Sequence, residues 1–259
     1  MDGIPDIIDT DWINQGGSAI WAPDVVPNVN GGYTMYFSAS AAASPSQHCV
    51  GAAHAENITG PYIPQKDALV CPISKGGAID AAHFTEDDGS QHLVYKIDAN
   101  SIGKRSCLAH IALESSGPNA GMATTGDSTT LICGLDSDRQ RIVEAPYLIK
   151  RNGQYTLLFS ASWYADSTYN TAYATSSSLL GPYTRAPGSL IQTGDFPGVN
   201  GPGGMSVERT SNLVVFHNHE VNNANTVVNK NKAISDDRAM WTGWIQLAED
   251  GSWEMRRRT

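Results

Sequence analysis

The sequence predicts an all-β fold, a β-propeller with about four blades present in a single domain over residues 1–259. Three observations lead to this prediction. The chain contains 25 glycines and 13 prolines, which favours many turns over long helices. Apolar residues alternate with a period of two in several short runs, whereas helical spacing is nowhere sustained. A segment of about 60 residues recurs along the chain, which is typical of one four-stranded blade with its loops.

The repeat is clearest between WAPDVVPNVNGGYTMYFSAS at 21–40 and EAPYLIKRNGQYTLLFSAS at 144–162. Both copies continue through a variable loop into a strand of small residues, and both end on the same GPY turn. Weaker copies occupy residues 78–98 and 201–220. Blades are therefore expected to begin near residues 19, 78, 142 and 201, after a linker-like segment at 1–18.

The individual strands follow from local patterns. The run Tyr33-Thr34-Met35-Tyr36-Phe37 alternates with a period of two, and Leu93-Val94-Tyr95 is a compact apolar run; Gly, Asn and Asp turns bound both. Aligning the first strands of the four copies places four residues at one repeat position: Trp21, Asp80, Glu144 and Gly204. In a propeller the innermost strands line a central channel, so these positions should converge on its axis.

Glu144 lies in the strand-like run IVEAPYLIK, where a carboxylate must be either desolvated at a cost or directed at something. The repeat predicts that it opens an innermost strand and points into the channel instead of the core. Asp80 is expected to face it across that channel. A carboxyl in a half-dry channel facing another carboxylate acquires a raised pKa, which a general acid needs.

The cysteines follow the repeat. Cys49 and Cys107 are predicted to begin the third strand of their blades, and Cys71 and Cys133 to follow it. Symmetry therefore favours the disulfides Cys49–Cys71 and Cys107–Cys133 among the three possible pairings. Each bond would contribute roughly 3 kcal/mol by loop closure and implies an oxidising, secreted origin. The absence of any close Cys-x-x-Cys or Cys/His cluster argues against zinc.

Composition limits the partners. The hydrophobic share of 41% and charged share of 17% describe a foldable chain, and the formal net charge of −9 disfavours nucleic acid and anionic lipid. No apolar run approaches a membrane span, and the N-terminus shows no signal-peptide core, so we expect a soluble secreted protein whose signal peptide is not in this chain. Arg256-Arg257-Arg258 is interpreted as a solvated terminus without function.

Four motifs together resemble glycoside hydrolase family 43, the five-bladed propeller enzymes that include β-xylosidases, α-L-arabinofuranosidases and arabinanases. They are AIWAPDVV, GGAIDAAHF, VEAPYLIKRNGQYTLLFS with its GPY close, and GPGGMSV, spread from residue 19 to about 207 in family order. The tail RAMWTGWIQL at 238–247 is similar to the last blade of the family.

The resemblance implies inverting hydrolysis of a pentoside in plant cell-wall polysaccharides or oligosaccharides, of the β-xylosidase or α-L-arabinofuranosidase type. By motif match, Glu144 is the general acid and Asp80 is the aspartate that tunes and orients it. An inverting acid and base stand about 6.5 to 9.5 Å apart, leaving room for the attacking water.

The general base is not identified. The family carries it on the innermost strand of the first blade, whereas only 20 residues precede Trp21 here and four blades are counted instead of five. Asp6, Asp9 and Asp11 are weak candidates, and Asp24 is expected to hold a turn or a neighbouring strand. Exposed blade edges would favour self-association. The alternative function is a carbohydrate-binding propeller that does not hydrolyse, and a purely structural propeller is a third reading.

Three further residues are predicted to bind substrate, each with a structural alternative. Trp21 offers a flat apolar face to a sugar ring or is a packing residue. Arg238 donates to substrate hydroxyls or pairs with a buried carboxylate. His217 faces the channel, where it binds water, substrate or the calcium found in some family members, or it is a satisfied core histidine. No cofactor is otherwise expected. His83 is interpreted as structural, and Lys96 as a channel residue or, preferably, a solvated edge residue.

Overall fold

The computed structural model describes residues 10–14, 20–136, 141–219 and 237–256. Asp6 and Asp9, most of the linker-like segment 1–18, and Arg257 and Arg258 lie outside the described residues. Contacts between Cα atoms group the chain into two compact units, Met1–Ile132 and Cys133–Thr259. Each unit contains two four-stranded antiparallel sheets, and each is described by itself.

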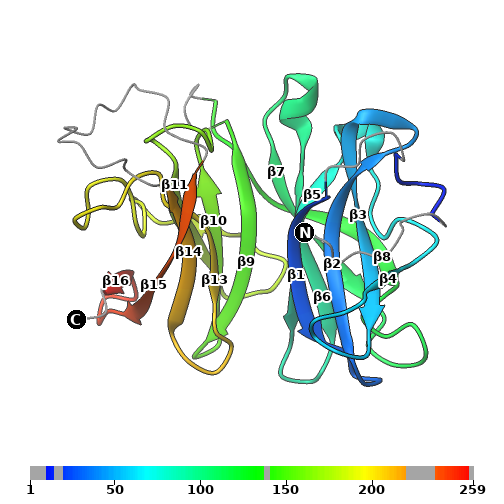
Figure 1. Cartoon of the computed structure of the whole chain (residues 1–259). Helices are drawn as coiled ribbons and strands as arrows, with labels where there is room; N and C mark the ends of the chain where they lie inside the picture. Colours follow the sequence, from blue (N-terminus) through cyan, green and yellow to red (C-terminus); the bar gives the residue numbers. More distant parts are fainter. Residues whose placement is uncertain (1–9, 15–19, 137–140, 220–236, 257–259) are drawn as a thin grey trace. The chain divides into compact units, whose positions relative to one another are not determined.

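In unit 1 the strands of both sheets follow one another in chain order, so neighbours in sequence are neighbours in the sheet (Figure 1). The first sheet consists of β1 (Ile20–Pro27), β2 (Tyr33–Ala41), β3 (Ser44–Ala55) and β4 (Ile63–Pro64). The second consists of β5 (Ala78–Thr85), β6 (Gln91–Ile97), β7 (Cys107–Leu113) and β8 (Thr124–Cys133). The helical elements of the described chain are two short 3₁₀ turns, η1 (Ile73–Lys75) and η2 (Ala99–Ile102).

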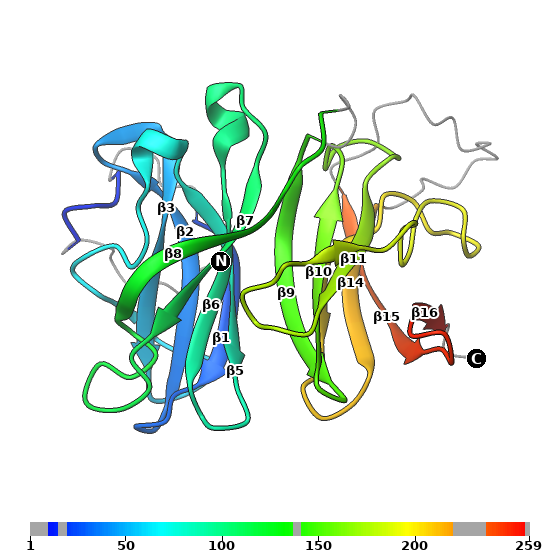
Figure 2. The ribbon, with the colours of Figure 1, turned by 180° about the vertical axis from the view of Figure 1, so that it is seen from behind.

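Unit 2 repeats this arrangement, and β9, β10 and β11 can be followed side by side in Figure 2. Its first sheet consists of β9 (Val143–Arg151), β10 (Gln154–Ala161), β11 (Asn170–Ser176) and β12 (Thr184–Arg185). Its second consists of β13 (Gly203–Val207), β14 (Leu213–His219), β15 (Arg238–Leu247) and β16 (Trp253–Arg256). The all-β prediction is confirmed.

Within each unit the second sheet packs against the first through its leading strand. β5 contacts β1, β2 and β3, and β13 contacts β9, β10 and β11. Apolar side chains fill the space between the sheets, including Tyr36, Leu93 and Tyr95 in unit 1 and Leu158, Ile191 and Phe216 in unit 2. The leading strand of each second sheet is thereby held rigidly beside its neighbour.

All four leading strands carry the same one-residue bulge near their start. Register shifts occur between Trp21 and Asp24, Ile79 and Ala82, Glu144 and Tyr147, and Gly203 and Ser206 on these strands. The residue after the first of each pair has a positive φ: 45° at Ala22, 58° at Asp80, 47° at Ala145 and 59° at Gly204. An extra residue in a left-handed conformation is found in one type of β-bulge, the G1 type.

The bulges correct the predicted repeat alignment by one residue. Trp21 and Glu144 are equivalent, but their counterparts are Ile79 and Gly203, which pair with the second strand in the same way. Asp80 is instead equivalent to Ala22 and Ala145. The sequence alignment missed this because a bulge shifts the side-chain alternation without a residue signature of its own.

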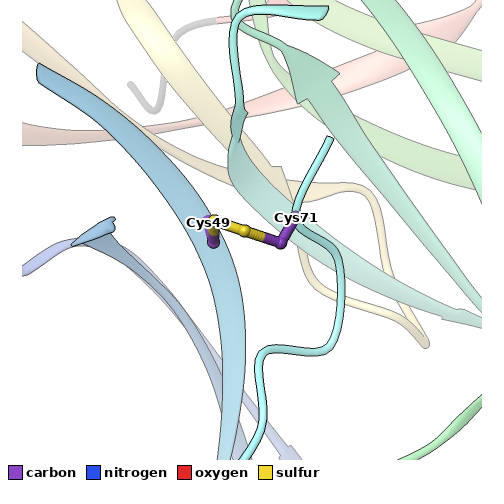
Figure 3. The surroundings of a disulfide bond; sticks show 2 residues. All are labelled: Cys49 and Cys71. Carbon is purple, nitrogen blue, oxygen red and sulfur yellow. A yellow bond between two sulfur atoms is a disulfide. The ribbon is translucent and has the colours of Figure 1, made fainter. Parts of the chain in front are cut away.

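Cys49 and Cys71 form a disulfide, with their Cα atoms 4.6 Å apart (Figure 3). Cys49 lies inside β3, which begins five residues before the predicted start, while Cys71 lies between β4 and η1. Cys107, the first residue of β7, and Cys133, the last of β8, are disulfide-bonded too, as the second expected pair requires. No helix among the described residues is long and apolar enough to cross a membrane.

Candidate active site

Glu144 is the second residue of β9 and is half-buried. The phenolic O–H of Tyr169 donates a hydrogen bond to its Oε1 at 2.6 Å. The main chain of Glu144 pairs with Ser160 of β10 at the edge of the bulge. The carboxyl group is therefore partly removed from water and directed at a hydrogen-bond donor, which offsets part of its desolvation cost.

Tyr169 immediately precedes β11 and is 3% exposed. Its ring stacks on the imidazole of His217, with ring centroids 5.7 Å apart and planes 10° apart. On another side it packs against Gly203, where an added Cβ would meet Cδ1 of the ring at 2.7 Å. The phenol is thus held by contacts from both sheets of unit 2. Sequence reasoning missed it because it lies in the variable loop between two repeat motifs.

His217 on β14 lies beneath that ring. Burial, together with the positive charges of Arg238 and His219, lowers the pKa of His217 to about 4. The imidazole is therefore neutral at pH 7. Its Nδ1 is buried and has no hydrogen-bond partner among the described residues. His219, two residues on, is fully buried, and its Nε2 donates to the carbonyl oxygen of Tyr164 at 2.8 Å.

Arg238 begins β15 and is exposed. Its guanidinium carbon lies 5.4 Å from the ring centroid of Tyr164, within the range of a cation–π contact. Tyr164 in turn is tilted against Trp163, with ring centroids 4.8 Å apart, and both aromatic residues are exposed. Arg238 therefore presents its charge beside an exposed aromatic pair, near His217.

In unit 1, Asp80 is the third residue of β5 and is half-buried. Its backbone N–H donates to the hydroxyl of Ser38 on β2 at 3.1 Å, and Ser38 is fully buried. In unit 2 the N–H of Gly204 donates to Ser160 in the same way at 2.9 Å. In each unit the serine hydroxyl of the first sheet thus anchors the bulge residue of the second sheet. In unit 1 this contact also fixes the position from which the Asp80 carboxylate projects.

Trp21 on β1 is 46% exposed and stacks on the imidazole of His48, with ring centroids 4.0 Å apart and planes 22° apart. Burial lowers the pKa of His48, although the negative charge of Asp98 works against this. One face of the indole is covered and much of the rest is open to solvent. Such a fixed ring can receive a sugar face.

The remaining candidates have structural contacts. Asp24 Oδ2 accepts a hydrogen bond from the N–H of His83 at 2.7 Å, joining the two sheets of unit 1. The buried ring of His83 stacks on Tyr36. The preferred reading of Lys96 as a solvated residue is wrong, because Lys96 is 2% exposed and its Nζ lies 2.8 Å from Asp98 Oδ1.

Asp11 lies exposed in a turn. Among the residues that the structure describes, no group of three or more His, Cys, Asp or Glu side chains is arranged to hold a metal ion.

A family model, glycosyl hydrolases family 43, matches residues 6–245 of the chain. The chain belongs to glycosyl hydrolases family 43. The family resemblance expected from the WAPD, AIDA and VEAP motifs is therefore confirmed.

Two curated relatives are similar to this family 43 chain. It is 28% identical over 221 residues to the β-D-galactofuranosidase xynD of Aspergillus niger, an alignment that covers 79% of this chain and 58% of that protein. It is 26% identical over 236 residues to the extracellular endo-α-(1→5)-L-arabinanase 1 of Bacillus subtilis, covering 82% of this chain and 65% of the relative. The family 43 chain thus spans about three fifths of the length of these relatives.

Solved structures share its fold. A thermostable family-43 glycoside hydrolase matches with a TM-score of 0.77 and 23% identity, over 97% of this chain and 78% of that one. An α-L-arabinofuranosidase from Lactobacillus brevis matches with a TM-score of 0.69 and 18% identity, over 94% and 78% of the two chains. At these identities the likeness shows the fold, and it confirms the predicted β-propeller architecture.

Proposed function

We propose that this family 43 chain is a glycoside hydrolase acting on plant cell-wall arabinan or xylan, or on carbohydrate of the galactofuranose type, with Glu144 as its general acid. The observation that carries the proposal is the half-buried Glu144 carboxyl at the bulge of β9, held by the Tyr169 hydroxyl at 2.6 Å. A general acid must be partly dry and fixed in orientation, and this arrangement supplies both conditions.

The finer assignment is inverting hydrolysis of a pentoside, of the β-xylosidase or α-L-arabinofuranosidase type. The relatives named for galactofuranoside and arabinan support a furanoside as the first substrate to test. Asp80 is proposed as the aspartate that tunes and orients the acid. Asp80 and Glu144 belong to different units, so this pairing rests on the family motifs AIDA and VEAP. The general base is unassigned.

Trp21, His217 and Arg238 are proposed to bind substrate. The exposed, stacked indole of Trp21 suits the apolar face of a sugar, and the neutral imidazole of His217 suits a hydroxyl. The guanidinium of Arg238 brings several N–H donors beside two exposed aromatic rings. Both disulfide pairs and the extracellular relatives support secretion. Calcium binding at His217 and self-association stay predictions.

Turnover of arabino-oligosaccharides and xylo-oligosaccharides by the chain and its Glu144→Gln variant tests the proposal. Removing a general acid should lower kcat by about 10² to 10⁴ on these substrates, whose leaving groups need a proton. Glu56→Gln is the control, because Glu56 is an exposed acid just after β3, in the other unit. Equal rates for the chain and its Glu144→Gln variant would refute the assignment of the acid.

The second candidate is a carbohydrate-binding propeller without hydrolysis. The exposed Trp21 stacked on His48 favours it, since an aromatic platform binds sugar without any catalytic group. Calorimetry with the same oligosaccharides separates the two functions. Binding heat without turnover would support the binding protein, while turnover lost in Glu144→Gln would support the hydrolase.

A further inference from the structure

The position occupied by Tyr169 contacts, in the first sheet of both units, the residue that precedes the bulge of the leading strand. Ser38 and Ser160 are equivalent, and their partners on the third strands are Val50 and Thr171. His48 lies two residues before Val50, and Tyr169 lies two residues before Thr171, so His48 and Tyr169 occupy equivalent positions. His48 stacks on Trp21, with the ring centroids 4.0 Å apart. The Tyr169 hydroxyl donates a hydrogen bond to the Glu144 carboxyl at 2.6 Å. The fold therefore directs the side chain at this position toward the second residue of the leading strand. In unit 2 this side chain is the phenol of Tyr169, and the residue it reaches is Glu144.

The phenol is fixed before any substrate arrives. The backbone N–H of Tyr169 donates to the carbonyl of Asp166 at 3.0 Å, and the ring lies against His217 and Gly203. His217 is neutral at pH 7 because of its burial and adjacent positive charges. A rigid donor loses little side-chain entropy when it holds a carboxyl, so the direction of its hydrogen bond is well defined.

The donated hydrogen bond distinguishes the two oxygens of the Glu144 carboxyl. A neutral carboxyl carries its proton on one oxygen, and an oxygen that accepts from a phenol is the less suitable one to carry it. The transferable proton is then on Oε2. During hydrolysis Oε2 gives that proton to the glycosidic oxygen, which keeps the electron pair of the breaking carbon–oxygen bond. The phenol then stabilises the carboxylate that forms.

We propose that Tyr169 is a positioning residue that orients the Glu144 carboxyl and directs its proton to Oε2. This inference rests on the proposed function, because it assumes that Glu144 is the acid. It assigns no proton transfer to Tyr169 itself.

Tyr169→Phe tests this, because the substitution removes the hydroxyl and keeps the ring stacked on His217. Tyr183→Phe is the matched control, since the Tyr183 hydroxyl donates to the carbonyl of Leu179 within the connection between β11 and β12. Arabinobiose or xylobiose, with a poor leaving group, is compared with the matching nitrophenyl glycoside, whose leaving group needs little protonation. We expect Tyr169→Phe to lower kcat about 10-fold or more on the disaccharide and about threefold or less on the nitrophenyl substrate.

The alkaline limb of the pH–rate profile should also move to higher pH in Tyr169→Phe, because the carboxylate loses a donor. Equal losses on both substrates with an unmoved limb would show a merely structural role and overturn the proposal. No loss on either would overturn it too. Tyr183→Phe should change neither the ratio of kcat on the two substrates nor the alkaline limb of the pH–rate profile.

If the chain turns over no substrate, the proposed function fails and carbon-13 NMR still decides the role of Tyr169. The Glu144 carboxyl carbon is assigned by its absence in Glu144→Gln and titrated in the chain and both phenylalanine variants. If the titration midpoint of the Glu144 carboxyl carbon moves to higher pH in Tyr169→Phe but not in Tyr183→Phe, the positioning role is supported. An unmoved midpoint overturns it.

Discussion

The hydroxyl of Ser38 accepts a hydrogen bond from the backbone N–H of Asp80 at 3.1 Å, across two neighbouring sheets of unit 1. Asp80 has a φ of 58°, a conformation that residues other than glycine seldom adopt. The Asp80 carboxylate, which we propose tunes the acid, therefore stands on a strained bulge that a buried serine holds in place. In unit 2, Ser160 holds Gly204 in the same way, but glycine adopts the positive φ without strain.

Ser38→Ala should lower the free energy of unfolding by about 1 to 3 kcal/mol, because it leaves the Asp80 N–H without this acceptor. It should also lower activity, since Asp80 is released from its position. Ser160→Ala is the matched control: a similar loss of stability is expected, with no effect on Asp80. Denaturant unfolding and turnover are the measurements, and full activity in a destabilised Ser38→Ala would contradict the anchoring role.

Gly203→Ala should destabilise the protein by about 1 to 3 kcal/mol through overpacking. The new Cβ would press on the Tyr169 ring and come within 2.9 Å of Ser160 Oγ. Glu144 should then lose its hydrogen bond, and activity should fall. Gly188→Ala, where a Cβ meets nothing within 4 Å, is the control. Thermal unfolding of both variants checks the prediction, which fails if the two melt alike.

The buried pair His92 and His110 should make stability depend on pH. Their rings meet with His110 Nε2 and His92 Nδ1 3.0 Å apart. Burial, together with the neighbouring His92, lowers the pKa of His110 to about 4. Burial also lowers the pKa of His92, while Glu86 and Asp88 act in the opposite direction.

Since the folded pKa lies below the unfolded value, stability is present above about pH 6.5 and is lost as the pH falls toward 4. His110 alone should cost about 2 kcal/mol by pH 5. The free energy of unfolding of His110→Gln should fall less steeply over this range. Parallel curves for the chain and this variant would show that His110 does not contribute.

Removing the Cys49–Cys71 disulfide with a double alanine substitution should cost roughly 3 kcal/mol, because the bond closes a loop with a sequence separation of 22. Denaturant unfolding without reductant measures the loss. With reductant present the difference between the chain and the variant should shrink, and a difference that persists unchanged would place the cost in packing instead of the cross-link.

Trp21→Ala should weaken oligosaccharide binding roughly 2- to 10-fold, the range expected for losing one aromatic contact. Calorimetry measures the affinity. Trp244→Ala is the control, because Trp244 is also exposed, at 40%, but lies on β15 without a stacked imidazole among its described ring contacts. Equal affinity for the chain and Trp21→Ala would remove Trp21 from the binding site.

The strands were predictable because their cause is local. Alternating apolar residues in Tyr33–Phe37 and the preceding turn residues Gly31 and Gly32 favour a strand at β2, independently of the elements against which it packs. The disulfides were predictable for a related reason, since the repeat places Cys49 and Cys107 at equivalent positions. The proposed acid Glu144 was visible in sequence as a carboxylate in an apolar strand.

Lys96 was misjudged, because a lysine is normally solvated and only the tertiary partner Asp98 makes its burial tolerable. Tyr169 could not be predicted as a site residue, because it lies in a variable loop 25 residues from Glu144 in sequence. Only the folded chain places its hydroxyl within hydrogen-bond distance of the Glu144 carboxyl.

The sequence by itself determined the all-β repeat and the family, and it singled out Asp80 and Glu144 as candidate site residues, because strand patterns and motifs consist of neighbouring residues. The tertiary structure alone decided the register. It placed Asp80 one position beyond the equivalent of Glu144, because the bulge depends on hydrogen bonds between strands and sheets that no neighbouring residue encodes.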